Sequence, residues 1–208
     1  MIAAERFDLR AIAPQAWKNG AGATREIAVG ARTGNDFDWR LSVAEVERDA
    51  PFSEFRGIDR CIVLLRGEGM RLRAPDGTLD HALREPLVPF RFLGDLALEA
   101  TLLGGACTDF NVMTRRGAFR SEVASRRDAF AVPAGPVAAD ACAAPAASVT
   151  LLLCAAGTWH VRADGDATLA PLQALLWRAP TGPISARPAA SSAAAALLLV
   201  RLYHEGTA

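Results

Sequence analysis

The sequence predicts an all-β protein, built as a duplicated β-barrel, and two observations lead to this prediction. Short apolar or alternating runs separated by turn residues recur about every 8 to 15 residues, and no long segment has the 3.6-residue period of a helix. The second half also repeats the first at a constant offset of 88 residues. We therefore expect two units packed as one body: an N-terminal half at 1–127 with the functional site, and a degenerate C-terminal half at 128–208.

The strands of the first half are predicted from side-chain alternation and from apolar runs. In FDWRLSVAEV (37–46), the residues Phe37, Trp39, Leu41 and Val43 alternate with Asp38, Arg40, Ser42 and Ala44. Such alternation is typical of a strand between an apolar layer and a more polar one. Further strands are expected at 61–65, 70–72, 87–93, 96–103 and 109–114. The Pro-x-Gly chemistry of APDG (74–77) predicts a tight turn between two of them.

The repeat is carried by identical residues that recur without a gap. Leu64, Leu65, Gly69, Asp76, Gly77, Leu87, Gly94 and Val112 correspond to Leu152, Leu153, Gly157, Asp164, Gly165, Leu175, Gly182 and Val200. The Ala/Pro-rich stretch between the copies, 128–148, is expected to run over the surface. The copies differ in chemistry, because Asp109 and Asn111 correspond to Leu197 and Leu199. Buried polar groups cost free energy unless they are paired, so we expect the first copy to use them.

The composition excludes several classes of partner. Hydrophobic residues make up 51% of the chain, charged residues make up 22%, and the formal net charge is zero, so no global field favours nucleic acid or an anionic membrane. The start, MIAAERFDLR, is charged where a signal peptide needs its apolar core, and AAAALLLV is too short for a membrane helix. We expect a cytoplasmic protein. Cys61, Cys107, Cys142 and Cys154 form no CxxC pair and are expected to be reduced, mostly buried thiols.

Small duplicated β-barrels with this strand spacing resemble the cupins, which are RmlC-like jelly rolls, and PFSEFRGIDRCIVLLRGEG (51–69) follows the cupin frame. A typical cupin has two histidines one residue apart, a glutamate after four further residues and a glycine after six more. This chain has Ser53, Phe55, Arg60 and Gly67 there. Transition metals prefer imidazole, carboxylate or thiolate ligands, and Ser-Phe-Arg offers none of these. We therefore expect a bicupin with no metal and no other cofactor. The three histidines, His81, His160 and His204, lie far apart in sequence and are expected at the surface or in satisfied core positions.

Arg60 is the first candidate for ligand binding. A fixed guanidinium in the place of a metal ion selects for an anion, since its planar fork matches a carboxylate through two hydrogen bonds. We expect it to bind a carboxylate or a phosphate. The alternative is an internal ion pair, with Glu45, Glu54, Asp59 or Asp109 as the partner. Arg40, beside Ser42 on the polar face of 37–46, has the same two interpretations.

The stretch AWKNGAGATREI (16–27) is the second candidate. Its glycines allow close backbone approach, while Trp17, Lys18 and Asn19 supply an aromatic wall, a cation and hydrogen-bonding groups. The lysine precedes the glycines and the P-loop spacing is absent, so this is not a phosphate-binding P-loop. We expect an ordered loop that closes the mouth of the barrel, a place from which its side chains can also line a pocket.

The third candidate is GGACTDFNVMTRRG (104–117), in which Asp109 and Asn111 share one face of a strand with Arg115. Asp109 is a candidate general base. A carboxylate beside arginines has a lowered proton affinity, however, and more often serves as a structural counter-ion. No Ser/His/Asp order, activated cysteine or closely spaced pair of acids offers another mechanism.

Together these stretches resemble the HutD/Ves family of metal-free, cupin-like proteins. The resemblance is carried by WKNGAGATREI, FDWRLSVAEV, PFSEFRGIDRCIVLLRGEGMRL, PFRFLGD and DFNVMTRRG, which span residues 14 to about 117. It implies a bicupin, often a homodimer, that is either stress-induced or regulates histidine utilisation by binding a pathway intermediate such as N-formylglutamate. It also implies a set of pocket residues: Trp17, Asn19, Trp39, Arg40, Ser42, Phe52, Arg60, Phe92 and Asn111.

The sequence thus predicts a metal-free cupin that binds a small carboxylate-bearing metabolite and modulates histidine utilisation or a stress response. We expect no chemical step. The alternative is a cupin-type isomerase or hydrolase that uses Asp109 or Glu45 as its general base.

Overall fold

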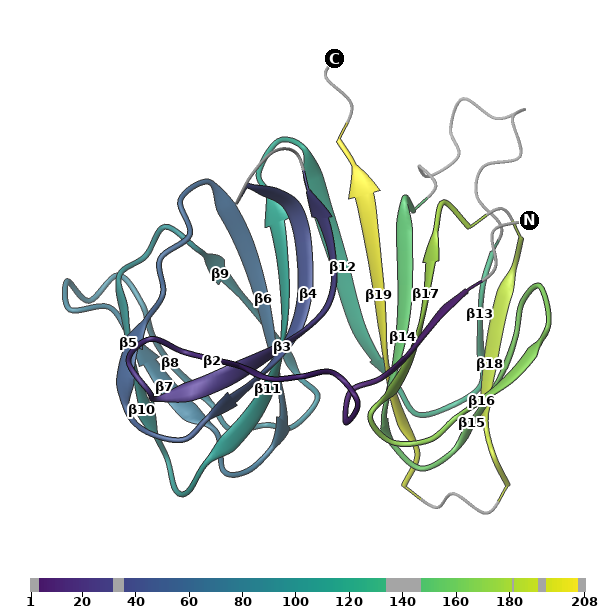
Figure 1. Ribbon diagram of the computed structural model, residues 1–208, viewed down its shortest axis with the longest axis horizontal. Helices are drawn as coiled ribbons and strands as arrows, with labels where there is room; N and C mark the ends of the chain where they lie inside the picture. The colour runs from purple at the N-terminus through teal and green to yellow at the C-terminus, as the bar shows by residue number, and fades with distance from the viewer. Residues whose placement is uncertain (1–3, 32–35, 134–146, 181, 191–193, 206–208) are drawn as a thin grey trace. The chain divides into compact units, whose positions relative to one another are not determined.

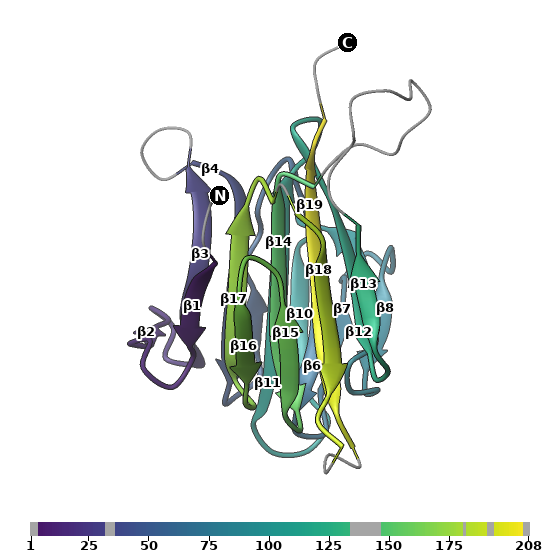
Figure 2. The same ribbon diagram turned by 90° about the vertical axis from the view of Figure 1, so that its right-hand side faces the viewer.

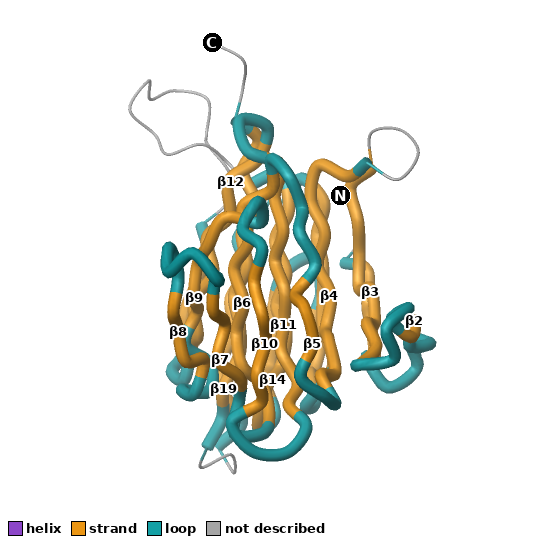
Figure 3. The backbone as a smooth tube through the Cα atoms, turned by 90° about the vertical axis from the view of Figure 1, so that its left-hand side faces the viewer, coloured by secondary structure: helices purple, strands orange, loops and turns teal. Residues whose placement is uncertain are grey.

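The computed structural model describes residues 4–31, 36–133, 147–180, 182–190 and 194–205, and every regular element within these ranges is a β-strand (Figures 1 and 3). The all-β prediction is therefore confirmed for the described residues. Cys142 and most of the Ala/Pro-rich stretch, 134–146, lie outside them. Within the same ranges, no helix is long and apolar enough to cross a membrane.

The chain divides into two compact units. The N-terminal unit comprises residues 12–120, and the C-terminal unit comprises the described residues of 4–11 and 121–205. The division falls at 120/121 rather than at the expected 127/128, because the strand that begins at Phe119 hydrogen-bonds into a sheet of the C-terminal unit. The first described residues also join the C-terminal unit, which the sequence did not indicate.

The N-terminal unit contains one six-stranded sheet, in the order β2-β3-β4-β11-β6-β9, and one four-stranded sheet, in the order β5-β10-β7-β8 (Figure 3). Its strands are β2 (Gln15–Ala16), β3 (Gly22–Ala31), β4 (Phe37–Val46), β5 (Ala50–Phe52), β6 (Ile58–Arg66), β7 (Met70–Arg73), β8 (Asp80–Leu83), β9 (Pro89–Leu93), β10 (Leu98–Leu102) and β11 (Cys107–Arg115). All pairs in both sheets are antiparallel.

One apolar core joins these two sheets. Alternate residues of the six-stranded sheet, such as Ile62 and Leu64, pack against Met70, Leu72 and Leu98 of the four-stranded sheet. The expected closed barrel is not present. Hydrogen bonding ends at the edge strands β2 and β9 in one sheet and β5 and β8 in the other, so the described residues form two open sheets packed face to face.

Several expected local features are confirmed. The predicted strand 37–46 is β4, and the APDG turn is closed by a hydrogen bond from the Gly77 amide to the Ala74 carbonyl (3.0 Å). Gly77 has a φ of 80°, which glycine adopts without strain. The strand expected at 87–93 begins only at Pro89, since Leu87 has a φ of 66° and so cannot continue a strand.

The C-terminal unit also contains two sheets, in the orders β1-β17-β14-β19-β12 and β13-β18-β15-β16 (Figure 2). Its strands are β1 (Glu5–Asp8), β12 (Phe119–Arg126), β13 (Phe130–Val132), β14 (Val149–Ala156), β15 (Trp159–Arg162), β16 (Asp166–Leu169), β17 (Gln173–Arg178), β18 (Ile184–Pro188) and β19 (Ala196–His204). A second apolar core around the fully buried Trp159 joins them. Strand orders of the N-terminal unit recur in this unit: β4-β11-β6-β9 corresponds to β12-β19-β14-β17, and β5-β10-β7-β8 corresponds to β13-β18-β15-β16. The strand β1 lies outside this correspondence.

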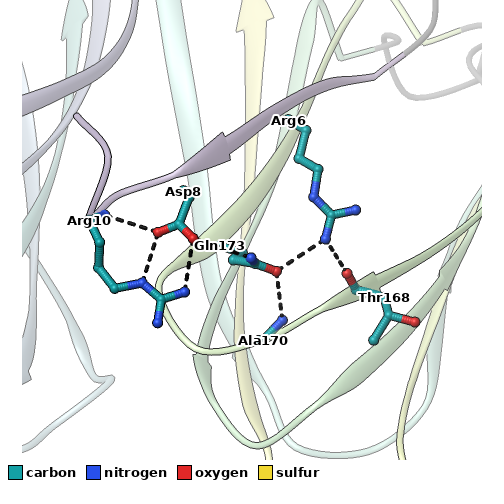
Figure 4. Close-up of polar contacts among 6 residues, drawn as sticks. All are labelled: Arg6, Asp8, Arg10, Thr168, Ala170 and Gln173. Atoms are coloured by element: carbon teal, nitrogen blue, oxygen red, sulfur yellow. Dashed lines mark hydrogen bonds and ion pairs between the residues drawn. The ribbon is translucent and has the colours of Figure 1, made fainter.

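A polar network fastens the short edge strand β1 to its neighbour β17 (Figure 4). Arg6 Nη2 donates to the Thr168 carbonyl (2.6 Å) and to Gln173 Oε1 (3.1 Å), and Gln173 Nε2 donates to Asp8 (3.3 Å). Arg10 donates to Asp8 from its side chain and its backbone amide, which holds the pKa of Asp8 well below its usual range. This network explains why residues 4–11 belong to the C-terminal unit.

Candidate functional site

A cavity of about 430 Å³ lies in the N-terminal unit. Its lining comes from the β2–β3 hairpin, from β4, β6 and β11, and from β5 with the segment that follows it. The lining residues are Gln15, Ala16, Trp17, Lys18, Asn19, Thr24, Arg40, Ser42, Ala44, Pro51, Phe52, Ser53, Phe55, Arg60, Asn111 and Met113. This volume is in the range of pockets that hold small metabolites.

Arg60 is the most deeply buried cation of this lining, with only 5% of its surface exposed. It lies on β6, two residues before Ile62, and a strand places such residues on the same face. Ile62 belongs to the core between the sheets, so Arg60 also points inward. The alternation of β6 thus carries a charged side chain into the apolar layer.

Three phenylalanine rings surround the Arg60 guanidinium. Its central carbon lies 4.4 Å from the ring centroid of Phe52, 5.4 Å from that of Phe55 and 5.0 Å from that of Phe92. A guanidinium at this distance from aromatic faces gains cation–π attraction, and the rings limit the conformations of the side chain. The guanidinium is therefore held in place before any ligand arrives.

The hydrogen bonds of Arg60 leave part of its fork unused. Nη1 donates to the Ser53 carbonyl (3.2 Å) and Nη2 donates to Asn111 Oδ1 (2.7 Å), whereas the buried Nε has no partner among the described residues. No carboxylate of the described chain forms an ion pair with Arg60, so the expected alternative of a direct internal pair is not observed. Burial lowers the pKa of Arg60 to about 10, against the opposing effect of Asp109, and the side chain stays cationic at neutral pH.

Asp109 lies behind Asn111 and does not line the cavity. Its side chain is fully buried, Asn111 Nδ2 donates to Oδ1, and Oδ2 has no partner among the described residues. Burial raises the pKa of Asp109 to about 7, although Arg60 and the hydrogen bond from Asn111 both act to lower it. The expectation of a lowered proton affinity was wrong, because desolvation outweighs the attraction of the nearby guanidinium.

The charges that line the cavity are all positive. They belong to Lys18, Arg40 and Arg60, and no aspartate or glutamate is among the described lining residues. Arg40 is partly neutralised, since its Nε donates to Glu26 Oε2 at 2.7 Å. Arg60 has no such counter-ion in contact, so the cavity presents a net positive potential at its buried end.

A hydrogen-bonded hairpin, β2–β3, shapes another part of the cavity wall. The Trp17 and Gly20 backbone amides donate to the carbonyls of Gly22 and Trp17, each at 2.9 Å, and Trp17 Nε1 donates to Thr24 Oγ1 at 2.8 Å. The Asn19 carboxamide oxygen accepts from the Ala21 amide (3.1 Å) and so closes the turn. The stretch expected as an ordered loop is this β2–β3 hairpin.

The structure brings together seven of the nine residues predicted for the pocket. Trp17, Asn19, Arg40, Ser42, Phe52, Arg60 and Asn111 line the cavity. Trp39 and Phe92 are not among the lining residues. Trp39 alternates with Arg40 on β4 and lies against Gly30, where an added Cβ would meet its indole at 2.3 Å. Phe92 packs against the guanidinium of Arg60 instead.

The pocket set implied by the resemblance leaves out several lining side chains, among them Lys18, Thr24, Phe55 and Met113. Two of them had a usable signal. Phe55 occupies a cupin metal-ligand position, and Met113 follows Asp109 and Asn111 at the strand period. The other two, Lys18 and Thr24, lie in the stretch 16–27, from which side chains were expected to be able to line a pocket.

The residues of the enzymatic alternative are poorly placed for catalysis. Asp109 is separated from the cavity by Asn111, and Glu45 accepts a hydrogen bond from Arg25 at 2.5 Å without lining the cavity. Among the described residues no group of three or more His, Cys, Asp or Glu side chains could hold a metal ion. Cys61, Cys107 and Cys154 are buried free thiols, and burial raises the pKa of each, so none is an activated nucleophile.

Comparison with known proteins identifies the family. The family model of HutD matches residues 10–198. The chain belongs to the HutD family. The structure of HutD from Pseudomonas fluorescens SBW25 is similar to this HutD-family chain, with a TM-score of 0.81 and 27% identity over 98% of this chain and 100% of that one. A conserved protein of unknown function from Pseudomonas aeruginosa PAO1 is also similar, with a TM-score of 0.80 and 30% identity over 96% and 98%.

A more distant likeness shows the fold alone. A cupin 2 conserved barrel domain protein from Leptotrichia buccalis has a TM-score of 0.58 and 10% identity, over 97% of both chains. The HutD-family chain therefore has an all-β, cupin-like fold. Ser53, Phe55 and Arg60, the three residues that the sequence pattern assigned to the cupin metal-ligand positions, all line the cavity.

Proposed function

We propose that this HutD-family protein binds a small carboxylate-bearing metabolite in the cavity and thereby modulates histidine utilisation, without catalysing a reaction. The observation that supports this proposal is the buried, caged guanidinium of Arg60. Arginine has five N–H donors, and the hydrogen bonds to Ser53 and Asn111 use two of them within the described chain. The remaining donors, in a cavity whose described lining residues include no acid, suit the two oxygens of a carboxylate.

The rest of the lining suits a small metabolite with both apolar and polar groups. Trp17, Phe52 and Phe55 offer aromatic surface, while Ser42 and Asn111 offer hydrogen-bonding groups. Acidic intermediates of histidine degradation, with N-formylglutamate first, are the class to test because the chain belongs to the HutD family. A role in a stress response would use the same cavity.

Thermal unfolding in the presence of each acid tests the proposal. A ligand that binds only the folded protein at about 100 times its Kd stabilises it by about 2.7 kcal/mol, which is measurable as a rise in Tm. N-formylglutamate should raise the Tm, and the corresponding uncharged diamide should not. If no acid of the panel raises the Tm, the proposed function is wrong. Consumption of an acid during incubation with the protein would contradict the non-catalytic role.

Variants of Arg60 identify the group responsible. Arg60→Met keeps an apolar stem among the phenylalanine rings but removes every N–H donor, so the ligand-dependent rise in Tm should disappear. Arg60→Lys keeps the charge but lacks the planar fork, and we expect an intermediate rise. The matched control is Arg71→Met, since Arg71 is exposed in the same unit and pairs with Asp80 at 2.6 Å. If the ligand raises the Tm of Arg60→Met as much as that of the wild type, Arg60 does not belong to the binding site.

We also propose that the two units descend from one duplicated eight-stranded unit, which would make the protein a bicupin. The matching strand orders of β4–β11 and β12–β19 support this proposal, together with the 88-residue sequence repeat. In the second copy, leucines replace Asp109 and Asn111 at the repeat positions Leu197 and Leu199. The copy with these polar residues is the one whose cavity contains the buried Arg60.

A further inference from the structure

One buried acid of the N-terminal unit has no role in the binding site as described so far. Asp109 is completely buried, yet within the described part of the chain its side chain has no ion pair and accepts a single hydrogen bond, from Asn111. A buried carboxylate usually accepts several hydrogen bonds or contacts a cation, because an unpaired charge in the interior costs much free energy. The free oxygen Oδ2 has no donor among the described residues and is an obvious place for a proton.

Asn111 links this acid to the guanidinium. Its Nδ2 group donates to Asp109 and its Oδ1 accepts from Arg60 Nη2 at 2.7 Å, so one amide touches both charged groups. The amide cannot turn over without losing both hydrogen bonds, since an oxygen would then face the carboxyl and an NH₂ group would face the guanidinium. Asp109, Asn111 and Arg60 therefore form a fixed chain from the interior to the cavity.

Few other charges act on this chain. Asp109 pairs with Ala44 on β4 and with Leu64 on β6, and its own strand contributes Cys107 as the nearest other titratable group. Arg60 on β6 is the cation that acts on Asp109, and Arg40 on β4 in turn acts on Arg60. Burial keeps Cys107 protonated, because it raises the pKa of that thiol to about 12.

The binding of an anion changes this balance. In the ligand-free protein, Asp109 is the carboxyl whose charge Arg60 stabilises. An anion at Arg60 adds a second negative charge that competes for the same guanidinium at low dielectric, where like charges repel strongly. Two acids that share one cation relieve this repulsion when one of them binds a proton. Asp109 has the free oxygen and the burial to do so.

We propose that Asp109 is the proton acceptor of the anion site, so that the carboxylate ligand and one proton bind together. This inference rests on the proposed function. A hydronium ion from solvent transfers its proton to Asp109 Oδ2, one O–H bond forms, and water leaves. Asp109 does not touch the ligand; it is a positioning residue that acts through Asn111 and Arg60.

The coupling predicts a definite pH dependence. The pKa of ligand-free Asp109 is raised to about 7, and an anion beside Arg60 must raise it further. The affinity is therefore constant below about pH 7 and falls above it, by about tenfold per pH unit, until the ligand-bound Asp109 also ionises. Arg60 does not produce this fall, since its pKa of about 10 lies well above that range.

Calorimetry with N-formylglutamate tests the coupling. Titrations at about pH 8, in buffers of different ionisation enthalpy, count the protons taken up per ligand bound, and we expect close to one. Asp109→Asn mimics the protonated acid, so it should take up none and should bind about tenfold more tightly than the wild type at about pH 8. The matched control, Asp80→Asn, alters an exposed acid of the same unit and should behave like the wild type.

The outcomes separate the two proposals. Binding without proton uptake in the wild type, or weaker binding by Asp109→Asn at about pH 8, overturns the coupling and leaves the carboxylate site intact. A merely structural Asp109 would give that weaker binding, because its loss would loosen Asn111. Failure of every histidine-pathway acid to bind overturns the proposed function and the coupling with it.

Discussion

At the scale of single residues, the site depends on the contrast between two buried charges. Arg60 has aromatic rings on several sides and hydrogen-bond acceptors on part of its fork, whereas Asp109 has one hydrogen bond and no cation in contact. Charged groups in an interior are retained mostly where they are used, because apolar replacements of similar shape are often as stable. The two buried charges therefore lower the stability of the folded protein and are retained for the function of the cavity.

This cost should appear in the pH dependence of folding. The pKa of Asp109 is raised in the folded protein from its ordinary value of 3.8 to about 7, so the folded state binds more protons than the unfolded state between these values. Stability is highest below about pH 4 with respect to this group and is lost as pH rises through about 7. Asp109→Asn should gain about 2 to 4 kcal/mol in free energy of unfolding relative to the wild type over this range, measured by urea denaturation.

A second variant checks the sign of that effect. The backbone amide of Gly57 and the side chain of Arg116 donate to Asp95, and these hydrogen bonds lower the pKa of Asp95. A lowered pKa contributes stability above the unfolded value, so Asp95→Asn should lose stability relative to the wild type as pH rises. If the stabilities of both variants, relative to the wild type, change in the same direction as pH rises, burial does not govern the pKa of Asp109.

At the scale of elements, the β2–β3 hairpin positions the aromatic wall of the cavity through a close backbone contact. A Cβ added at Gly22 would lie 2.1 Å from the Glu45 carbonyl oxygen of β4 and 3.2 Å from the Trp17 ring. Gly22→Ala should therefore destabilise the protein by about 2 to 4 kcal/mol in chemical denaturation and weaken ligand binding. Gly105→Ala is the control, because an added Cβ there meets nothing within 4 Å. Equal stability of the two variants would show that β3 shifts to accept the methyl group.

The attachment of β1 to β17 is the second prediction at this scale. Gln173 accepts from Arg6 and Ala170 and donates to Asp8, so it touches both sides of the network in Figure 4. Gln173→Ala should increase hydrogen exchange of the β1 amides by about fivefold, since a net hydrogen bond is worth about 1 kcal/mol. Asp166→Ala, on an exposed ion pair of the same unit, should leave β1 unchanged. Unaltered exchange in Gln173→Ala would mean that the backbone hydrogen bonds between β1 and β17 are enough to hold β1 in place.

The sequence predicted individual strands and turns better than it predicted whether the sheets close into a barrel. The strand 37–46 was placed to the residue because its alternation is uninterrupted, and the APDG turn followed from its proline and glycine. The open sheets could not be predicted, since closure depends on hydrogen bonds between strands distant in sequence. Asp109 was misjudged for a related reason: sequence shows a neighbouring charge but not the depth at which burial outweighs it.

At the scale of the whole molecule, the assembly state is a further prediction. The family resemblance implies a homodimer, and light scattering of the purified protein should then give about twice the 22.0 kDa mass of one chain. The scattering should be measured over a range of protein concentrations, because a weak dimer dissociates on dilution. A mass of one chain at every concentration would rule the dimer out.

The strand β1 also sets an order of events during synthesis on the ribosome. Residues 12–120 contain both sheets of the N-terminal unit and can pair as soon as they emerge. Glu5–Asp8 emerge earlier still, yet their partner Gln173–Arg178 is translated much later. The strand β1 is thus synthesised well before its partner β17, and in the interval it is a short, charged segment with little tendency to aggregate.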